Sequence, residues 1–180
     1  YLEACLQDVR AQLPPRPPED ELLFHETQYA DDCNFISCSK AWLRNALVVV
    51  ADVFRGYGFQ VNESKTEWIH MTKKQGEGEA WRNVRQLGSL LGDAEDVANR
   101  KRLASAAYHG LRKMWGHRRI STDRKMRLYN SFVLPVLLYN SGTWGLTVAD
   151  SNSLDSFHRR QLRGLLDIRW PARIGNEALY

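Results

Sequence analysis

Apolar side chains recur every three or four positions in several stretches of the chain, which is the spacing of a helix with one buried face. Residues 1–13 follow this pattern, and the proline-rich run that begins at Pro14 predicts where the helix ends, because proline cannot continue it. A second apolar stripe predicts a helix over residues 40–55, with Ser39 as its N-terminal cap.

Extended segments alternate with these helices. Residues 25–37 contain two strand-like stretches on either side of Ala30, Asp31 and Asp32, and this composition predicts a β-hairpin with an acidic tip. Further extended segments are predicted over residues 59–62, 68–71 and 81–91, with a loop over residues 73–78.

The second half of the chain has helical periodicity almost throughout. It predicts helices over residues 95–117 and 122–139, the latter either kinked or broken at Pro135. A third helix is predicted to follow Thr147 and Asp150, which have the spacing of a capping box, and to end near residue 167. The chain is therefore predicted to be an α+β protein. A mixed part over residues 1–92 precedes a helical part over 93–168, and residues 169–180 begin a following segment.

Composition places the chain among ordinary globular proteins, because 43% of its 180 residues are hydrophobic and 26% are charged. No apolar run approaches the roughly 18 residues that would span a bilayer, and the first residues do not form a signal peptide. The cysteines are few and fit no zinc-binding pattern, so no zinc site is predicted. Their scarcity favours a reducing compartment, and we expect an intracellular protein, cytoplasmic or nuclear, without a membrane partner.

Charge is unevenly distributed, although the net charge is only +4. Residues 100–127 contain ten lysines and arginines but a single acid, Asp123, whereas the first thirty residues lean acidic. A basic block together with a carboxylate-rich segment suits a protein that binds a polyanion near a metal ion. The same charges also suit exposed helix faces with no ligand, and charge alone does not decide between the two.

Two adjacent carboxylates at a hairpin tip are costly unless a positive charge neutralises them. Mg²⁺ does this well, since it prefers hard oxygen ligands and keeps waters that substrate phosphates can replace. Successive strand residues point to opposite faces, so Asp31 and Asp32 reach one metal site only where the backbone turns sharply. A solvated surface turn is the alternative for this pair taken by itself.

The context of the pair carries a resemblance. Residues 28–32, followed by Phe35 and Ile36, closely resemble the catalytic hairpin of reverse transcriptases. Residues 58–66 are similar to the next polymerase motif of that family, and residues 86–92 to its primer-grip hairpin. The segments 134–139 and 158–163 are similar to sequence that follows the palm in non-LTR (LINE-like) retrotransposons, so the resemblance covers nearly the whole chain.

This resemblance implies the carboxy-terminal palm and thumb of an RNA-directed DNA polymerase. Such a nucleotidyltransferase uses two Mg²⁺ ions to extend a DNA primer on an RNA template with deoxynucleoside triphosphates. Asp31 and Asp32 match the metal-binding aspartates, Tyr29 would lie beside the primer end, and Lys65 matches a catalytic lysine that acts on the departing pyrophosphate. The remaining expected nucleic-acid contacts are the primer-grip residues Leu87 and Gly88 and the thumb cations Arg100, Lys101, Arg102, Arg112, Lys113, Arg118 and Arg119.

The chain also departs from the family pattern. The metal site of reverse transcriptases needs a third carboxylate on an earlier strand, and the fingers precede that strand. We therefore expect the missing amino-terminal fingers and palm of the same polypeptide before residue 1, and we expect the 180 residues to be inactive alone. A non-catalytic nucleic-acid-binding module derived from such an enzyme is the principal alternative. A palm-like nucleotide cyclase is a third, against which the Lys65 segment and the basic helices argue.

Overall fold

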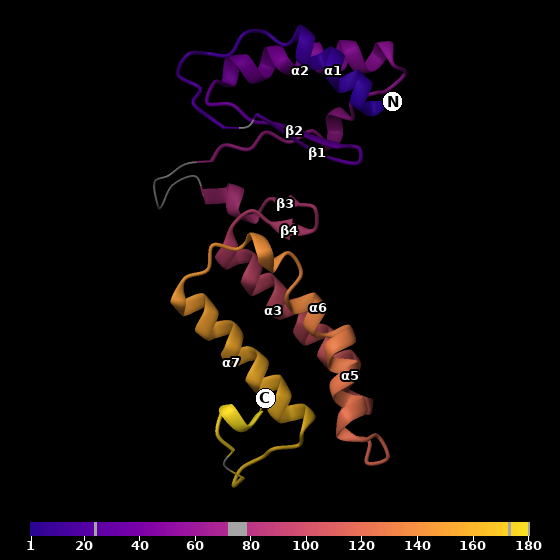
Figure 1. The fold of residues 1–180 in the computed structure, drawn as a ribbon, viewed down its shortest axis with the longest axis vertical. Helices are drawn as coiled ribbons and strands as arrows, with labels where there is room; N and C mark the ends of the chain where they lie inside the picture. The colour runs from indigo at the N-terminus through magenta and orange to yellow at the C-terminus, as the bar shows by residue number, and fades with distance from the viewer. Residues whose placement is uncertain (24, 72–78, 173, 180) are drawn as a thin grey trace. The chain divides into compact units, whose positions relative to one another are not determined.

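The computed structural model describes residues 1–23, 25–71, 79–172 and 174–179, which divide into two compact units, Tyr1–Trp68 and Ile69–Tyr180 (Figure 1). Both units combine helices with a small antiparallel hairpin, so the predicted α+β class is confirmed at that level. The division does not fall at residue 92, where we expected it, because the second hairpin packs on the helix that follows it.

The first unit is built from two helices and one hairpin. α1 (Leu2–Gln12) and α2 (Lys40–Gly56) lie side by side, with β1 (Glu26–Tyr29) and β2 (Asp32–Phe35) beneath them in Figure 1 and the short 3-10 helix η1 (Glu63–Lys65) after α2. Apolar side chains from both helices, from β2 and from the segment after α2 form its core, in which Cys5, Val9, Val50 and Val53 are buried and Phe35, Phe54, Phe59 and Val61 pack against them.

Local sequence explains the ends of these elements. The side chain of Ser39 accepts a hydrogen bond from the Trp42 amide at 3.2 Å, which confirms the predicted cap of α2. The indole of Trp42 donates to the carbonyl of Pro14 at 3.0 Å, and this bond ties α2 to the proline run that ends α1. The strands predicted over residues 59–62 and 68–71 are not formed, since in this part of the chain no neighbouring strand satisfies their backbone groups. The loop predicted over residues 73–78 lies outside the described residues.

The second unit begins with a short hairpin and continues in helices. The predicted strand over residues 81–91 is instead the 3-10 helix η2 (Glu79–Asn83) followed by the antiparallel strands β3 (Arg85–Gln86) and β4 (Ser89–Leu90). The helical elements that follow are α3 (Asp93–Gly110), α4 (Arg112–Trp115), α5 (Thr122–Phe132), α6 (Leu134–Leu137), η3 (Ser141–Thr143), α7 (Val148–Leu165) and η4 (Glu177–Leu179). In the described part of the chain, no helix is both long and apolar enough to cross a membrane.

Two of the predicted helices are interrupted. The helix predicted over residues 95–117 ends at Gly110 and resumes after Leu111 as α4. The helix predicted over residues 122–139 breaks at Val133, two residues before Pro135. Proline lacks an amide donor and its ring crowds the preceding turn, which explains why this helix breaks rather than bends.

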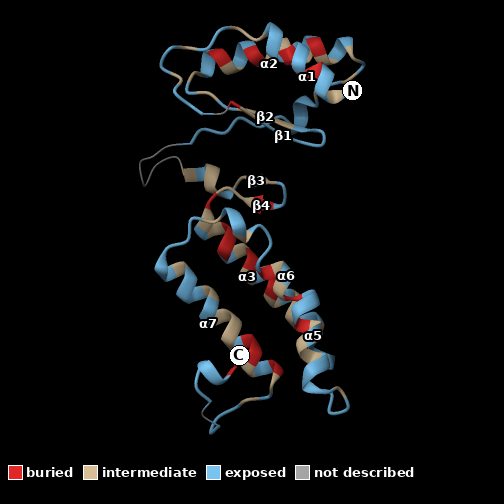
Figure 2. Cartoon of the chain, viewed as in Figure 1, coloured by how far each residue is buried: buried red, intermediate tan, exposed pale blue. Residues whose placement is uncertain are grey.

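The core of the second unit lies where α3, α5, α6 and α7 meet (Figure 2). Tyr129 is fully buried there, with its hydroxyl 2.8 Å from His158 Nδ1 and 3.1 Å from Gln161 Oε1. Burial lowers the pKa of His158 below the usual value for histidine. The other buried members are Ala104, Trp115, Val133, Leu137, Leu162 and Leu165.

We expected residues 169–180 to begin a further segment, but residues 174–179 fold back on α7. The Arg163 guanidinium donates to Asn176 Oδ1 at 2.8 Å, and Leu179 of η4 is buried. The described end of the chain therefore belongs to the helical unit.

The capping box at the start of α7 supplies a test of the fold. Asp150 N donates to Thr147 Oγ1, and the Asp150 carboxylate accepts from the Thr147 amide, both at 3.2 Å. We expect Thr147→Ala to lower the free energy of unfolding by about 1 kcal/mol in urea denaturation followed by tryptophan fluorescence. The hydrogen bonds from Thr147 lower the pKa of Asp150, so the difference should be largest at neutral pH and decrease as the pH falls through that lowered pKa, because only the bond from Asp150 N to Thr147 Oγ1 is independent of the carboxylate charge.

The matched control is Thr122→Ala, which makes the same change in the first residue of α5. It should alter stability by no more than about 0.5 kcal/mol. Equal losses in the two variants would contradict a specific role for the capping box.

Candidate functional site

The acidic turn of the first unit is tight and strained. Tyr29 pairs with Asp32 in the β1–β2 register, so only Ala30 and Asp31 connect the strands. Ala30 has φ 51°, in the left-handed region that residues with a Cβ rarely adopt. Strain of this kind persists where the surrounding structure imposes it, and it marks the hairpin tip as a candidate functional position.

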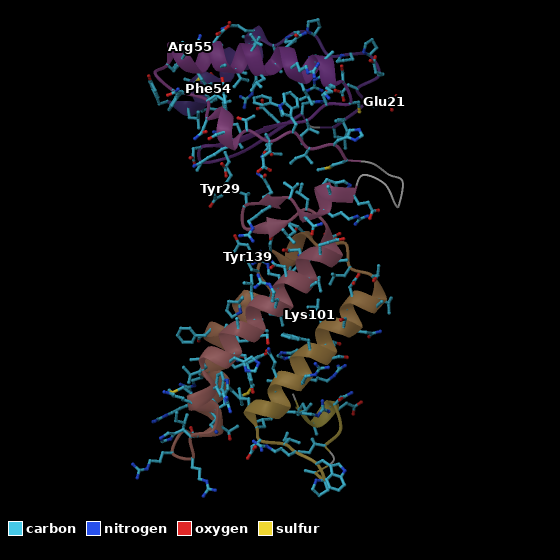
Figure 3. All side chains as sticks on the ribbon, turned by 180° about the vertical axis from the view of Figure 1, so that it is seen from behind. Glu21, Tyr29, Phe54, Arg55, Lys101 and Tyr139 are labelled. Carbon is cyan, nitrogen blue, oxygen red and sulfur yellow. The ribbon has the colours of Figure 1, made fainter. Side chains whose placement is uncertain are left out.

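The two carboxylates of this turn are uncompensated. Asp31 and Asp32 are exposed, and among the described residues neither takes part in an ion pair or a hydrogen bond with another side chain. Tyr29 is 66% exposed next to them (Figure 3). The described residues also hold no group of three or more metal-ligating side chains. The turn thus offers two hard oxygen donors, which fit part of a Mg²⁺ site but do not complete one.

The base of the hairpin is held by charge. Arg10 on α1 forms ion pairs with Glu26, the first residue of β1, and with Glu3, the latter at 2.9 Å. Hydrogen bonds to Glu26 and then to Glu3 raise the pKa of Arg10 further above its already high value. In the next residue pair toward the turn, Asn34 Nδ2 donates to Thr27 Oγ1 at 3.1 Å. Within the described ranges, the acidic tip is therefore the part of the hairpin that has no neutralising partner.

Cys33 of β2 is half-buried near this turn. Burial, followed by the nearby carboxylates, raises the pKa of its thiol, which keeps the sulfur neutral. Cys5, Cys33 and Cys38 are all free thiols.

Lys65 ends η1 and is exposed. Asn62 organises this segment through local hydrogen bonds: its carbonyl accepts from Thr66 Oγ1 at 2.9 Å and its side chain accepts from Ser64 Oγ at 2.7 Å. The ammonium group of Lys65 is thereby left on the surface of the first unit.

The second unit carries a tight turn at the expected primer-grip position. Gln86 pairs with Ser89, so Leu87 and Gly88 alone connect β3 and β4. Their φ angles are 49° and 84°, both left-handed, as in the two-residue turns that match the twist of a hairpin. Glycine adopts this conformation freely, whereas Leu87 adopts it under strain while its side chain is 45% exposed.

Most of the expected thumb cations are on the surface, but Arg100 is not. Arg100 is only 5% exposed and its guanidinium bonds to groups inside the second unit, so its assignment to the phosphate-facing surface was wrong. Lys101 is partly exposed and donates to Ser153 Oγ at 2.8 Å. The exposed members of the predicted set are Arg102, Arg112, Lys113, Arg118 and Arg119.

The sequence reasoning also missed residues that support the second turn. Asp96 and Tyr139 contact both this hairpin and Arg100, and Trp144 donates to Asp96. The spacing of Asp96 and Arg100, four residues apart on one helix, was a signal that could have indicated an ion pair.

Comparison with known proteins identifies no relative of this chain: no protein-family model, no curated protein and no solved structure matches it. Membership of the reverse-transcriptase family therefore stays a prediction that rests on the motifs and on the geometry of their turns.

The left-handed backbone at Ala30 predicts how position 30 responds to substitution. Ala30→Gly should leave the unfolding free energy of the first unit unchanged or raise it, because glycine adopts φ 51° without strain. Ala30→Val should lower it by at least about 1 kcal/mol, since a β-branched residue is a severe outlier there. Chemical denaturation of the two variants checks this order, and a valine variant as stable as the glycine variant would contradict the strained turn.

Proposed function

We propose that this chain is the carboxy-terminal palm and thumb portion of an RNA-directed DNA polymerase. The observation that carries the proposal is the β1–β2 turn, a two-residue connection with exposed, adjacent carboxylates and no cation beside them in the described structure. An uncompensated carboxylate pair on a strained turn is the arrangement that a divalent cation stabilises.

In the complete enzyme, Asp31 would hold both Mg²⁺ ions and Asp32 would be its weaker companion. When bound, such ions activate the primer 3′ hydroxyl and neutralise the triphosphate. The third carboxylate and the nucleotide pocket would come from the amino-terminal part of the same polypeptide. The exposed Lys65 would neutralise or protonate the departing pyrophosphate. The exposed Tyr29 would lie beside the primer end.

The second unit supports the same proposal through charge. Its exposed cations are concentrated on α4 and the segment that follows it, where Arg112, Lys113, Arg118 and Arg119 have no ion-pair partner among the described residues. Unpaired surface cations bind phosphates without sequence preference, which suits a thumb that follows a moving duplex.

A non-catalytic nucleic-acid-binding module is the second candidate function. The same cations favour it, because they do not depend on the carboxylates of the first unit. The two candidates differ in what Asp31 does: a polymerase needs its carboxylate for nucleotide transfer, whereas a binding module does not.

A primer-extension assay separates them. With Mg²⁺ and a primed RNA template, the 180-residue chain alone should incorporate no nucleotide. A polypeptide in which the amino-terminal fingers and palm of a related polymerase precede Tyr1 should incorporate nucleotides, and Asp31→Asn should abolish this while duplex binding is retained. The matched control is Asp52→Asn, an exposed acid of the same unit that pairs with Arg55. Full incorporation by the Asp31 variant would refute the metal-binding role and favour the binding module.

The cations after α4 predict a salt-dependent interaction. Arg118→Glu combined with Arg119→Glu should weaken binding of an RNA–DNA duplex and reduce the slope of log K against log salt by about 0.9 for each phosphate that the variant no longer neutralises. Fluorescence anisotropy over a salt series measures both quantities. Arg55→Glu, a charge reversal in the first unit, is the control, and an equal effect there would mean that binding follows net charge alone.

A further inference from the structure

Behind the Leu87–Gly88 turn lies a buried charged network. Asp96 on α3 is 0% exposed, and its Oδ1 accepts the Leu90 amide at 3.0 Å. Its Oδ2 accepts the indole N–H of Trp144 at 3.0 Å, and Arg100 Nε lies 3.5 Å from Oδ1. Each oxygen of this carboxylate therefore has a partner, and one of those partners is the backbone of β4.

The other members of the network reach the turn itself. Arg100 Nη2 donates to the Gly88 carbonyl at 2.6 Å and to Ser89 Oγ at 2.9 Å. The Arg100 guanidinium lies 4.3 Å from the centre of the Tyr139 ring, and the Tyr139 hydroxyl donates to the Leu87 carbonyl at 2.9 Å. Tyr139 lies beside this hairpin in Figure 3. Both carbonyls of the turn are thus bonded to side chains of the same unit.

This arrangement occupies the hydrogen-bond acceptors of the turn and, among the described residues, leaves its amide donors free. The carbonyl oxygens of Leu87 and Gly88 each already accept a hydrogen bond from a side chain. The amide N–H groups of the same two residues make no hydrogen bond within the described structure, and both residues are exposed. A polyanion that approaches the turn would meet hydrogen-bond donors rather than acceptors, which is the condition for backbone recognition of a phosphate.

We propose that Asp96, Arg100 and Tyr139 are positioning residues, which hold the Leu87–Gly88 turn so that its amide groups face the phosphodiester backbone of a bound strand. The identity of that strand as the primer rests on the proposed function. The three residues act through the turn and do not themselves touch nucleic acid.

A purely stabilising role explains this network less well. A buried ion pair adds little net stability compared with apolar residues of similar size, because desolvation offsets the attraction between the charges. Here Arg100, besides its ion pair with Asp96, donates to the hairpin at Gly88 and Ser89, and Tyr139 donates to it at Leu87. The contacts therefore determine where the turn lies as well as how stable the unit is.

Tyr139→Phe tests the proposal with the smallest change. It removes the bond to the Leu87 carbonyl but keeps the ring over Arg100 and leaves the net charge unaltered. Amide hydrogen exchange of the peptide over residues 85–91 should accelerate. The Kd for a DNA primer annealed to RNA should rise about fivefold, the size expected for loss of one hydrogen bond, with an unchanged salt slope.

Tyr57→Phe is the matched control, since it removes a hydroxyl bond to Asp8 in the first unit. It should change neither the exchange of residues 85–91 nor duplex binding. A second variant, Arg100→Gln, should produce a larger change in the exchange of the same peptide, because both of its contacts with Gly88 and Ser89 are weakened.

The two measurements separate the positioning role from the proposed function. Unchanged exchange over residues 85–91 in Tyr139→Phe overturns the positioning role, whatever the chain binds. Faster exchange with unchanged duplex affinity overturns the assignment of the turn to phosphate recognition. If the unaltered chain binds no duplex while exchange is faster in the variant, the proposed function fails and the positioning of the turn stands.

Discussion

The second unit depends on one constraint, which is that the carboxylate of Asp96 and the guanidinium of Arg100 are both removed from water. A buried charge is tolerated only when partners surround it, and both oxygens of Asp96 and the Nη2 atom of Arg100 have such partners. Helix α3 supplies both charged residues, and β4 supplies the Leu90 amide. Trp144, which follows η3, supplies its indole N–H. Segments distant in the sequence are thereby fixed around the start of one helix.

The first unit distributes charge in the opposite way. Its buried core consists of apolar side chains between α1 and α2. The ion pair between Arg10 of α1 and Glu26 of the hairpin is on the surface. The hairpin is therefore fixed at its base, while the carboxylates of Asp31 and Asp32 are left in water at its tip. In one unit charge is buried to fix a turn, and in the other it is exposed where a cation can reach it.

Local signals in the sequence predicted the long helices and the β1–β2 turn, whereas the Leu87–Gly88 turn was expected only from the family resemblance. The cap at Ser39, the capping box at Thr147 and the hairpin around Asp31 depend on residues within a few positions of each other, so a local pattern suffices to find them. The prediction of a strand over residues 68–71 was wrong, because a strand needs a neighbouring strand to pair with and the composition of a segment does not reveal one. The prediction that Arg100 is a surface cation was wrong for a related reason. Its burial depends on Gly88 and Tyr139, which lie 12 and 39 positions away in the sequence.

The length of α3 can be compared with the length of a ligand that would contact both ends of this helix. The helix has 18 residues and so extends about 27 Å, with the Leu87–Gly88 turn near its start and α4 after its end (Figure 1). One helical turn of a duplex measures about 34 Å, or about ten base pairs. A ligand that contacted both the turn and the cations near Arg118 would be of that order of length, which is longer than a single nucleotide.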